Sequence, residues 1–225
     1  IDLSLRNREA VGPLEKLQQE SLFRIDNWCT GFEKKIRALG GIGFFLGGIG
    51  PDGHIAFNTR GSDRNSTTRL TATNFETQAA SAGDLGGIEV AKKRLVITVG
   101  LATISARSDC TAVIMAAGEA RAGVVRDAVE AETGLLYPAT ALRALPGARL
   151  YLTEGAAVGL EERRFRHFVA MENPSPAEIE RVVIDLSLRL RTPVDGLSAA
   201  DLSADRFTAL LPGKTGMEPS AITRF

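Results

Sequence analysis

The chain has 225 residues, of which 44% are hydrophobic, and its 27 basic and 27 acidic side chains give a formal net charge of zero at pH 7. This length can bury one large core, so we expect a single α/β domain over residues 1–225. Balanced charge and the lack of an apolar run of ~18 residues argue against nucleic-acid and membrane partners and favour a small, locally recognised ligand.

The two cysteines, Cys29 and Cys110, are isolated and form no CxxC motif. Without secretory features in the composition, this pattern predicts reduced thiols in a cytoplasmic protein, and nothing in it indicates a metal site. The chain starts with "IDLSLRNREA", which contains neither an initiator methionine nor a signal pattern. It is therefore consistent with a fragment or a processed product.

Predicted helices and strands alternate along the chain. Apolar spacings of three to five residues predict a helix over 13–39, and the apolar run "IGFFLGGIG" predicts a buried strand that opens into a loop at Gly47–Gly53. Further strands are expected near 94–100, 111–118 and 148–155, with helices starting at Glu119, Ala139 and Ala156. This order predicts a mostly parallel, Rossmann-like sheet with helices on both faces, in a single layered domain.

Two regions depart from this alternation. Residues 58–87 are polar and poor in periodicity, which favours a lid or binding segment, with disorder as the alternative. Residues 174–225 are expected to form a C-terminal helical extension, with Ser198 as a helix cap. The hexapeptide "IDLSLR" occurs at 1–6 and again at 184–189, but its flanks differ, so we interpret the repeat as coincidence.

The loop "GPDGH" holds Asp52 and His54, one of only two histidines in the chain. Residues i and i+2 of an extended loop point the same way, so the carboxylate could orient the imidazole and raise its basicity. Gly50 and Gly53 would permit tight turns and close approach of a ligand to the backbone. The alternative is a structural histidine beside a glycine turn, and spacing does not decide between the two.

The segment "LGGIGPDGHIAFN" resembles the signature of the glucosamine-6-phosphate deaminase (isomerase) family, in which a strand leads into G-x-D-G-H-I-A-F-N. The similarity continues in order through "STTRL", "KKRLVITVGLATI", "GEARAGVVRDAVE" and "YPATALRALPGARLYLTEGAA", and covers roughly residues 32–157. The related 6-phosphogluconolactonases also carry D-G-H on this fold, but the residues that follow here match the deaminase version.

The resemblance implies a phosphorylated aminosugar as substrate, which is ring-opened, isomerised from aldose to ketose and relieved of ammonia without a cofactor. It implies that His54 is the acid and base of ring opening, with Asp52 as its partner. Arg121 matches a lysine of the family that binds the sugar phosphate, and Arg69 matches a basic residue of the lid region that binds an allosteric activator in some members. Oligomers are common in the family, so a homo-oligomer is an open expectation.

Three departures from the family pattern leave alternatives open. Thr59 stands where the family has a glutamate, and the family's further lid arginine has no clear counterpart. The family's N-terminal half, with a phosphate loop and an acidic residue, has no match in this chain. Besides the deaminase, the sequence therefore allows a catalytically inactive sugar-phosphate-binding or oligomerisation module of the same fold, or a 6-phosphogluconolactonase-like hydrolase.

Overall fold

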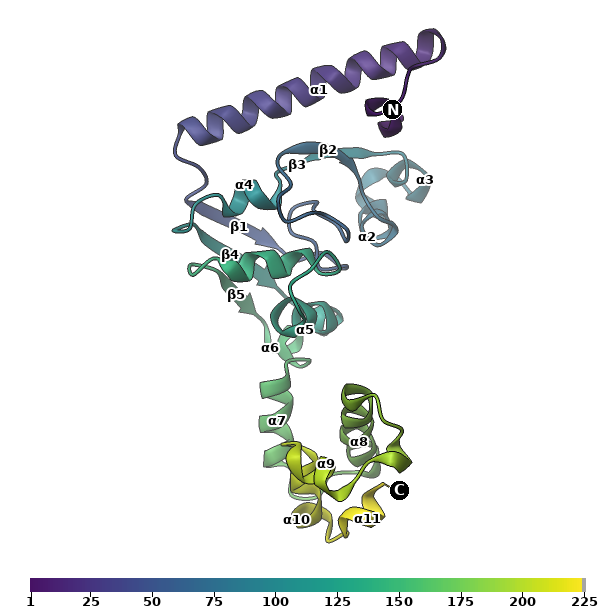
Figure 1. Ribbon diagram of the computed structural model, residues 1–225, viewed down its shortest axis with the longest axis vertical. Helices are drawn as coiled ribbons and strands as arrows, with labels where there is room; N and C mark the ends of the chain where they lie inside the picture. The colour runs from purple at the N-terminus through teal and green to yellow at the C-terminus, as the bar shows by residue number, and fades with distance from the viewer. Residues whose placement is uncertain (224–225) are drawn as a thin grey trace. The chain divides into compact units, whose positions relative to one another are not determined.

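The structure is a computed structural model that describes residues 1–223, and the chain divides into two compact units. The first, Ile1–Leu160, holds all the described strands, and the second begins at Glu161 and is helical (Figure 1). The helical part thus starts ahead of residue 174, where the extension was expected to begin.

Three parallel strands form the central sheet of the first unit: β1 (Phe44–Gly48), β4 (Thr111–Ala116) and β5 (Arg149–Leu152), in the order β1-β4-β5. β4 lies in the middle, pairing Gly47 with Ile114 on one side and Ile114 with Leu150 on the other. The predicted α/β class and parallel sheet are confirmed. Because all three strands run the same way, their carboxyl ends meet at one edge of the sheet.

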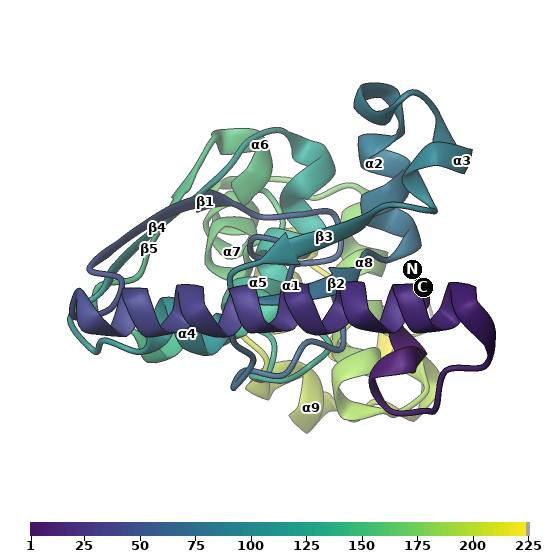
Figure 2. The ribbon, with the colours of Figure 1, turned by 90° about the horizontal axis from the view of Figure 1, so that it is seen from above.

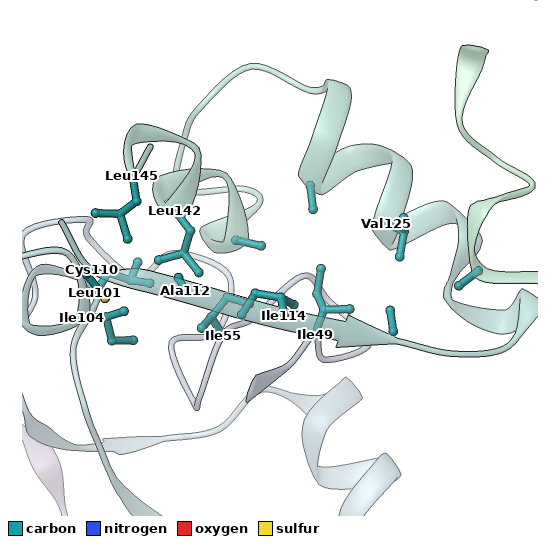
Figure 3. Packing of buried hydrophobic residues seen from close by; sticks show 14 residues of the cluster. Ile49, Ile55, Leu101, Ile104, Cys110, Ala112, Ile114, Val125, Leu142 and Leu145 are labelled. Carbon is teal, nitrogen blue, oxygen red and sulfur yellow. The ribbon is translucent and has the colours of Figure 1, made fainter. Parts of the chain in front are cut away.

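One face of this sheet is packed. Ala112, Ile114 and Ala116 of β4 alternate with less buried neighbours and lie in the main core (Figure 3). They pack with residues of α4 (Leu101–Ser105), α5 (Ala122–Glu130) and the 3-10 helix η3 (Pro138–Ala144). The strands alternate because successive side chains point to opposite faces.

The opposite face is apolar and exposed. Phe44 and Tyr151 are each 62% exposed, Leu46 is 55% and Met115 is 52% exposed. Helices were expected on both faces, but those of the described chain bury only one. Parallel sheets normally bury both faces, so this exposed apolar face departs from the usual pattern.

The N-terminal helix α1 (Gly12–Ala38) follows the short 3-10 helix η1 (Leu3–Arg6), and it crosses a two-stranded antiparallel ribbon (Figure 2). The ribbon consists of β2 (Arg69–Ala72) and β3 (Leu95–Thr98). The strand expected near 94–100 thus exists, but it pairs with β2 rather than with the parallel sheet. Leu5, Leu22 and Leu70 form a small core between these elements.

The long polar stretch is ordered in part into helices. α2 (Phe75–Leu85) and α3 (Ile88–Ala91) connect β2 to β3. Asn74 caps the start of α2, and Gly86 ends it with a left-handed backbone. Segment 58–87 therefore contributes a strand and a helix to the first unit.

One predicted helix is interrupted at a point where two stretches of backbone come close together. The helix expected from Ala156 splits into α6 (Glu154–Ala157) and α7 (Glu161–Ala170), with Gly159 between them. A Cβ at Gly159 would lie 2.9 Å from the backbone oxygen of Ala122, just after the 3-10 helix η2 (Glu119–Arg121). Only glycine permits this contact without a shift.

The second unit has its own apolar core, which includes Phe168, Ile179, Leu186 and Leu211. Its elements after α7 are α8 (Pro176–Leu190), η4 (Val194–Gly196), α9 (Ala199–Ala204), η5 (Thr208–Leu210), α10 (Leu211–Thr215) and α11 (Pro219–Ile222). Ser198 caps α9 as predicted, in a reciprocal capping box with Asp201. Within residues 1–223, no helix is both long and apolar enough to cross a membrane.

A buried carboxylate attaches α1 to the rest of the first unit. Glu33 is only 6% exposed, and its Oε1 accepts hydrogen bonds from the Thr68 backbone N (2.8 Å) and from Thr103 Oγ1 (2.6 Å). Burial alone would raise the pKa of Glu33, but the bonds from Thr103 and Thr68 outweigh it and hold this pKa below its ordinary value. The carboxylate therefore stabilises the fold in its charged form.

Replacing Glu33 by alanine is expected to lower the free energy of unfolding by about 1–3 kcal/mol, because two donors lose their buried acceptor. Urea denaturation followed by the fluorescence of Trp28, the only tryptophan and a residue of α1, measures the loss. Glu20→Ala, an exposed site on the same helix, is the control and should change little.

The effect of Glu33→Ala should also depend on pH. The folded pKa of Glu33 lies below the unfolded value, so its contribution is present above the unfolded pKa of about 4.3 and is lost as the pH falls through the folded pKa. The difference between wild type and variant should therefore shrink in acid. A difference that stays constant down to pH 2 would contradict this account.

Candidate active site

The loop after β1 turns back on itself through its glycines. Gly50 N donates to the His54 carbonyl oxygen (2.9 Å), and Gly53 N donates to that of Gly50 (3.1 Å). Gly53 has φ +81°, in the left-handed region that favours glycine, and its carbonyl accepts from Ala139 N (3.0 Å). These bonds tie the loop to itself and to η3.

The turn brings Asp52 and His54 together. His54 Nδ1 lies 2.5 Å from Asp52 Oδ1. The Asp52 side chain is fully buried, whereas the His54 side chain keeps 11% of its surface accessible. Both residues are therefore buried, and the Asp52 carboxylate lies behind an imidazole that keeps only a small accessible fraction.

Three donors hold the Asp52 carboxylate. Besides His54, the backbone N of Arg60 (3.0 Å) and Nδ2 of Asn74 (2.6 Å) both donate to Oδ2. Burial alone would raise the pKa of Asp52, but the bonds from His54, Arg60 and Asn74 outweigh it and keep this pKa well below its ordinary value. The carboxylate is therefore ionised at neutral pH and acts only as an acceptor.

This bonding pattern determines which imidazole nitrogen carries the proton in neutral His54. An ionised carboxylate cannot donate, so the proton of the short contact belongs to His54 Nδ1. Nε2 is then the unprotonated nitrogen, the ring atom that has a lone pair for a proton. The Thr77 hydroxyl, 3.2 Å from Nδ1 and 2.7 Å from Asn74 Oδ1, completes the group around the ring.

The backbone of Gly50 lies directly against the imidazole. A Cβ at this position would be 2.0 Å from Cε1, 2.2 Å from Nε2 and 2.3 Å from Nδ1 of His54. The ring therefore occupies the space that any other residue's side chain would take. On another side Phe57 stacks on His54, with ring centroids 6.0 Å apart.

Arg69 lies beside the same loop but bonds to other residues. Its guanidinium donates to Asn58 Oδ1 (2.9 Å) and to Ser62 Oγ (3.0 Å), and the Asn58 amide donates in turn to the carbonyls of Ile55 and Val99. Burial lowers the pKa of Arg69 below its ordinary value, although a guanidinium stays charged at neutral pH. Arg69 is thus a half-buried cation next to the D-G-H segment.

Arg121 follows the strand next to β1. It ends η2, between β4 and α5, and the carboxyl ends of β1 and β4 are neighbours because Gly48 pairs with Met115. Val124, one turn further along, is the residue nearest to a Cβ built at Gly53, at 3.4 Å. Arg121 and the Asp52–His54 pair therefore belong to the same edge of the sheet.

Sequence reasoning missed Asn74, Thr77 and the backbone N of Arg60. Asn74 lies in the stretch that shows no periodicity, yet an asparagine directly before "FETQAASAGDL" is a helix-cap signal. Thr59, at the position of the family glutamate, is buried, and the hydroxyl near the ring is that of Thr77. The residues described contain no group of three or more His, Cys, Asp or Glu that could hold a metal ion.

A parallel sheet whose first strand opens into a buried carboxylate–imidazole pair defines a Rossmann-like α/β protein with a candidate acid–base site at the strand ends. No family model matches the chain. The chain is 33% identical over 150 residues to the glucosamine-6-phosphate deaminase of Tolumonas auensis, covering 67% of this chain and 56% of that protein. Its identity to the Aedes aegypti glucosamine-6-phosphate deaminase is 33% over 158 residues, 70% of this chain and 56% of that one.

A solved structure of a monomeric glucosamine-6-phosphate deaminase is 28% identical and has a TM-score of 0.55 over 60% of this chain and 54% of that chain. The chain is therefore homologous to the glucosamine-6-phosphate deaminases, and the predicted resemblance is confirmed. It spans about half the length of the curated relatives that it matches.

Gly50→Ala is expected to displace the imidazole, because the new Cβ would overlap three ring atoms. The overlap should lower the free energy of unfolding by about 1–3 kcal/mol and change the NMR signals of the His54 ring. Gly123→Ala, in α5 with nothing near its added Cβ, is the control and should leave both unchanged or raise stability slightly. Unaltered His54 signals in Gly50→Ala would contradict the packing described.

Proposed function

We propose that this chain acts on a phosphorylated aminosugar in the manner of its deaminase relatives, with His54 and Asp52 as the acid–base pair of ring opening. The observation that carries the proposal is the 2.5 Å bond from His54 Nδ1 to a fully buried Asp52, because it leaves Nε2 to accept a proton. The homology supports glucosamine 6-phosphate as the substrate.

Ring opening needs one group that both takes and returns a proton. Nε2 of His54 would accept the proton of the hydroxyl on C1 while the bond from C1 to the ring oxygen breaks, and the imidazolium would then give a proton to that oxygen. Asp52 stabilises the transient imidazolium, since its carboxylate stays ionised and within hydrogen-bonding distance. The histidine ends in its starting state, so the step is balanced.

The sugar phosphate requires cations at the same edge of the sheet. Arg121 is proposed to bind it, because a guanidinium offers two parallel donors to a phosphate. Arg69 is proposed as an anion-binding residue for an effector, as the resemblance implies. Gly50 and Gly53 are proposed to contact the sugar through their backbone, since at Gly50 the space of the missing side chain is filled by the imidazole.

The residues named above account for ring opening, the first step of the proposed reaction. Isomerisation needs a base that moves a proton between C2 and C1, and the release of ammonia follows from it. A neutral hydroxyl at Thr59 does not replace the charge of a carboxylate. A catalytically inactive module that still binds the sugar phosphate is therefore the second candidate function.

A cytoplasmic location and a homo-oligomer are also proposed. Cys29 and Cys110 are free and buried, and burial raises the pKa of both thiols, which suits a protein kept in a reducing compartment. The expectation of a homo-oligomer rests on the resemblance.

Ammonia release from glucosamine 6-phosphate tests the proposal, and His54→Ala is expected to reduce its rate at least about 100-fold through loss of the acid–base group. Asp52→Asn should act in the same direction, because an amide can hold the ring in the wrong tautomer. His167→Ala is the control and should keep the activity, because His167, the other histidine of the chain, lies in the helical unit.

Three further outcomes separate the alternatives. Binding of glucosamine 6-phosphate without turnover, measured by calorimetry, would favour the inactive module. Hydrolysis of 6-phosphogluconolactone with no ammonia release would favour the lactonase. No binding and no turnover would contradict a role in sugar-phosphate chemistry altogether.

A further inference from the structure

The start of α2 is bonded to the acid–base pair through a single side chain. Asn74 Nδ2 donates to Asp52 Oδ2 (2.6 Å), while its Oδ1 accepts from the Thr77 backbone N (3.1 Å) and from Thr77 Oγ1 (2.7 Å). Only one orientation of the amide satisfies all three contacts, because a carboxylate cannot donate and a backbone N–H cannot accept. The amide therefore has one end on the carboxylate and the other on the helix.

Asn74 holds the oxygen of Asp52 that the imidazole does not use. Oδ1 accepts from His54, whereas Oδ2 accepts from Asn74 and from the backbone N of Arg60. Fixing Oδ2 fixes the plane of the carboxylate and with it the position of Oδ1. The orientation of the imidazole therefore depends on Asn74 although the two side chains do not bond to each other.

The same residue brings Thr77 to the ring. As the cap of α2, Asn74 determines where the first turn of this helix lies, and Thr77 Oγ1 stands 3.2 Å from His54 Nδ1. Thr77 is 3% exposed, so the contact is shielded from solvent. Both routes from Asn74, through Asp52 and through Thr77, end at the same ring nitrogen.

We propose that Asn74 is a positioning residue that keeps His54 protonated on Nδ1, and so leaves Nε2 as the reactive nitrogen, by joining the Asp52 carboxylate to the start of α2. Its role in turnover depends on the proposed function, but its role in orienting the ring does not. Asn74 thereby connects the first turn of α2, which lies in the segment 58–87 expected to be a lid, with the D-G-H loop.

The experiment must separate positioning from helix capping, since Asn74 does both. Asn74→Ser keeps a cap acceptor for the Thr77 backbone N, but its side chain is too short to reach Asp52. Asn74→Ala loses both functions. Gln78→Ala is the matched control, because Gln78 lies on the same helix and donates to the Thr73 carbonyl (2.7 Å), away from the pair.

Nitrogen-15 NMR reads the tautomer of His54 without substrate. The protein has two histidines, so His167 in the helical unit serves as an internal reference. We expect wild type and Gln78→Ala to show His54 protonated on Nδ1, and Asn74→Ser and Asn74→Ala to show a mixture of the two neutral forms. The His167 signals should be the same in all four proteins.

A capping role alone predicts a different result. In that case Asn74→Ser would keep both the urea midpoint and the His54 signals of the wild type, and this outcome would overturn the proposal. If Asn74→Ser fails to fold, Asn74→Asp replaces it, because aspartate also caps a helix but cannot donate once ionised. Unchanged His54 signals in a folded Asn74→Asp protein would overturn the proposal equally.

Kinetics extend the test where the protein releases ammonia. Asn74→Ser should lower kcat about tenfold, the scale of one charge-assisted hydrogen bond, with little change in KM, whereas Gln78→Ala should alter neither. A wild-type protein without ammonia release would contradict the proposed function, yet the tautomer measurement would still decide the role of Asn74. A tenfold rise in KM at unchanged kcat in Asn74→Ser would contradict the role of Asn74 as a positioning residue.

Discussion

The burial of the Asp52 carboxylate constrains the whole candidate site. A carboxylate removed from water is unfavourable by several kcal/mol unless donors replace the lost hydration. Here the donors come from His54 in the same loop, from the backbone N of Arg60 and from Asn74 at the start of α2. Since each segment must approach within hydrogen-bonding distance of one carboxylate, the hydrogen bonds to Asp52 fix their relative positions.

The apolar core of the first unit holds both ends of the D-G-H loop in place. Ile49 and Ile55 stand on either side of the loop, are 7% and 0% exposed, and both belong to the main apolar cluster (Figure 3). Anchored at both ends, the five residues between them have little freedom. The exposed apolar face of the sheet lies on the other side of the strands, so the site depends on the packed face alone.

Much of this could be predicted from the sequence because the signals are local. Short apolar runs bounded by glycine predicted β1, β4 and β5, and apolar spacing predicted α1 to within a residue or two at each end. The D-G-H loop stood out because His54 follows a strand and a glycine. What escaped prediction is non-local: β3 pairs with β2, and Asn74 reaches back 22 residues to Asp52. Neither contact leaves a periodic pattern.

The hexapeptide "IDLSLR" shows within one chain that a short local sequence does not determine its own structure. At 1–6 it forms a 3-10 turn in which Leu5 is fully buried, whereas at 184–189 it lies inside α8, where the matching Leu188 is 71% exposed. The difference arises from what each copy packs against: the first against α1, and the second along an amphipathic helix whose Leu186 faces the core. Six residues do not specify their own structure when tertiary packing decides which side is buried.

Thr59 stands where the deaminase pattern has a glutamate, and this difference bears on the role of Asp52 beside the imidazole. With a neutral residue at the position of the family glutamate, Asp52 is the only carboxylate that bonds to the ring among the residues described. Protonation of His54 would then give a neutral ion pair with Asp52. Because Asp52 is the single carboxylate at the ring, the orientation of the imidazole depends on the plane of that one carboxylate. Because Oδ2 is held by Arg60 and Asn74 and only Oδ1 faces the imidazole, the orientation of the ring depends on bonds on the far side of Asp52, and so would the direction of the proposed proton transfer at Nε2.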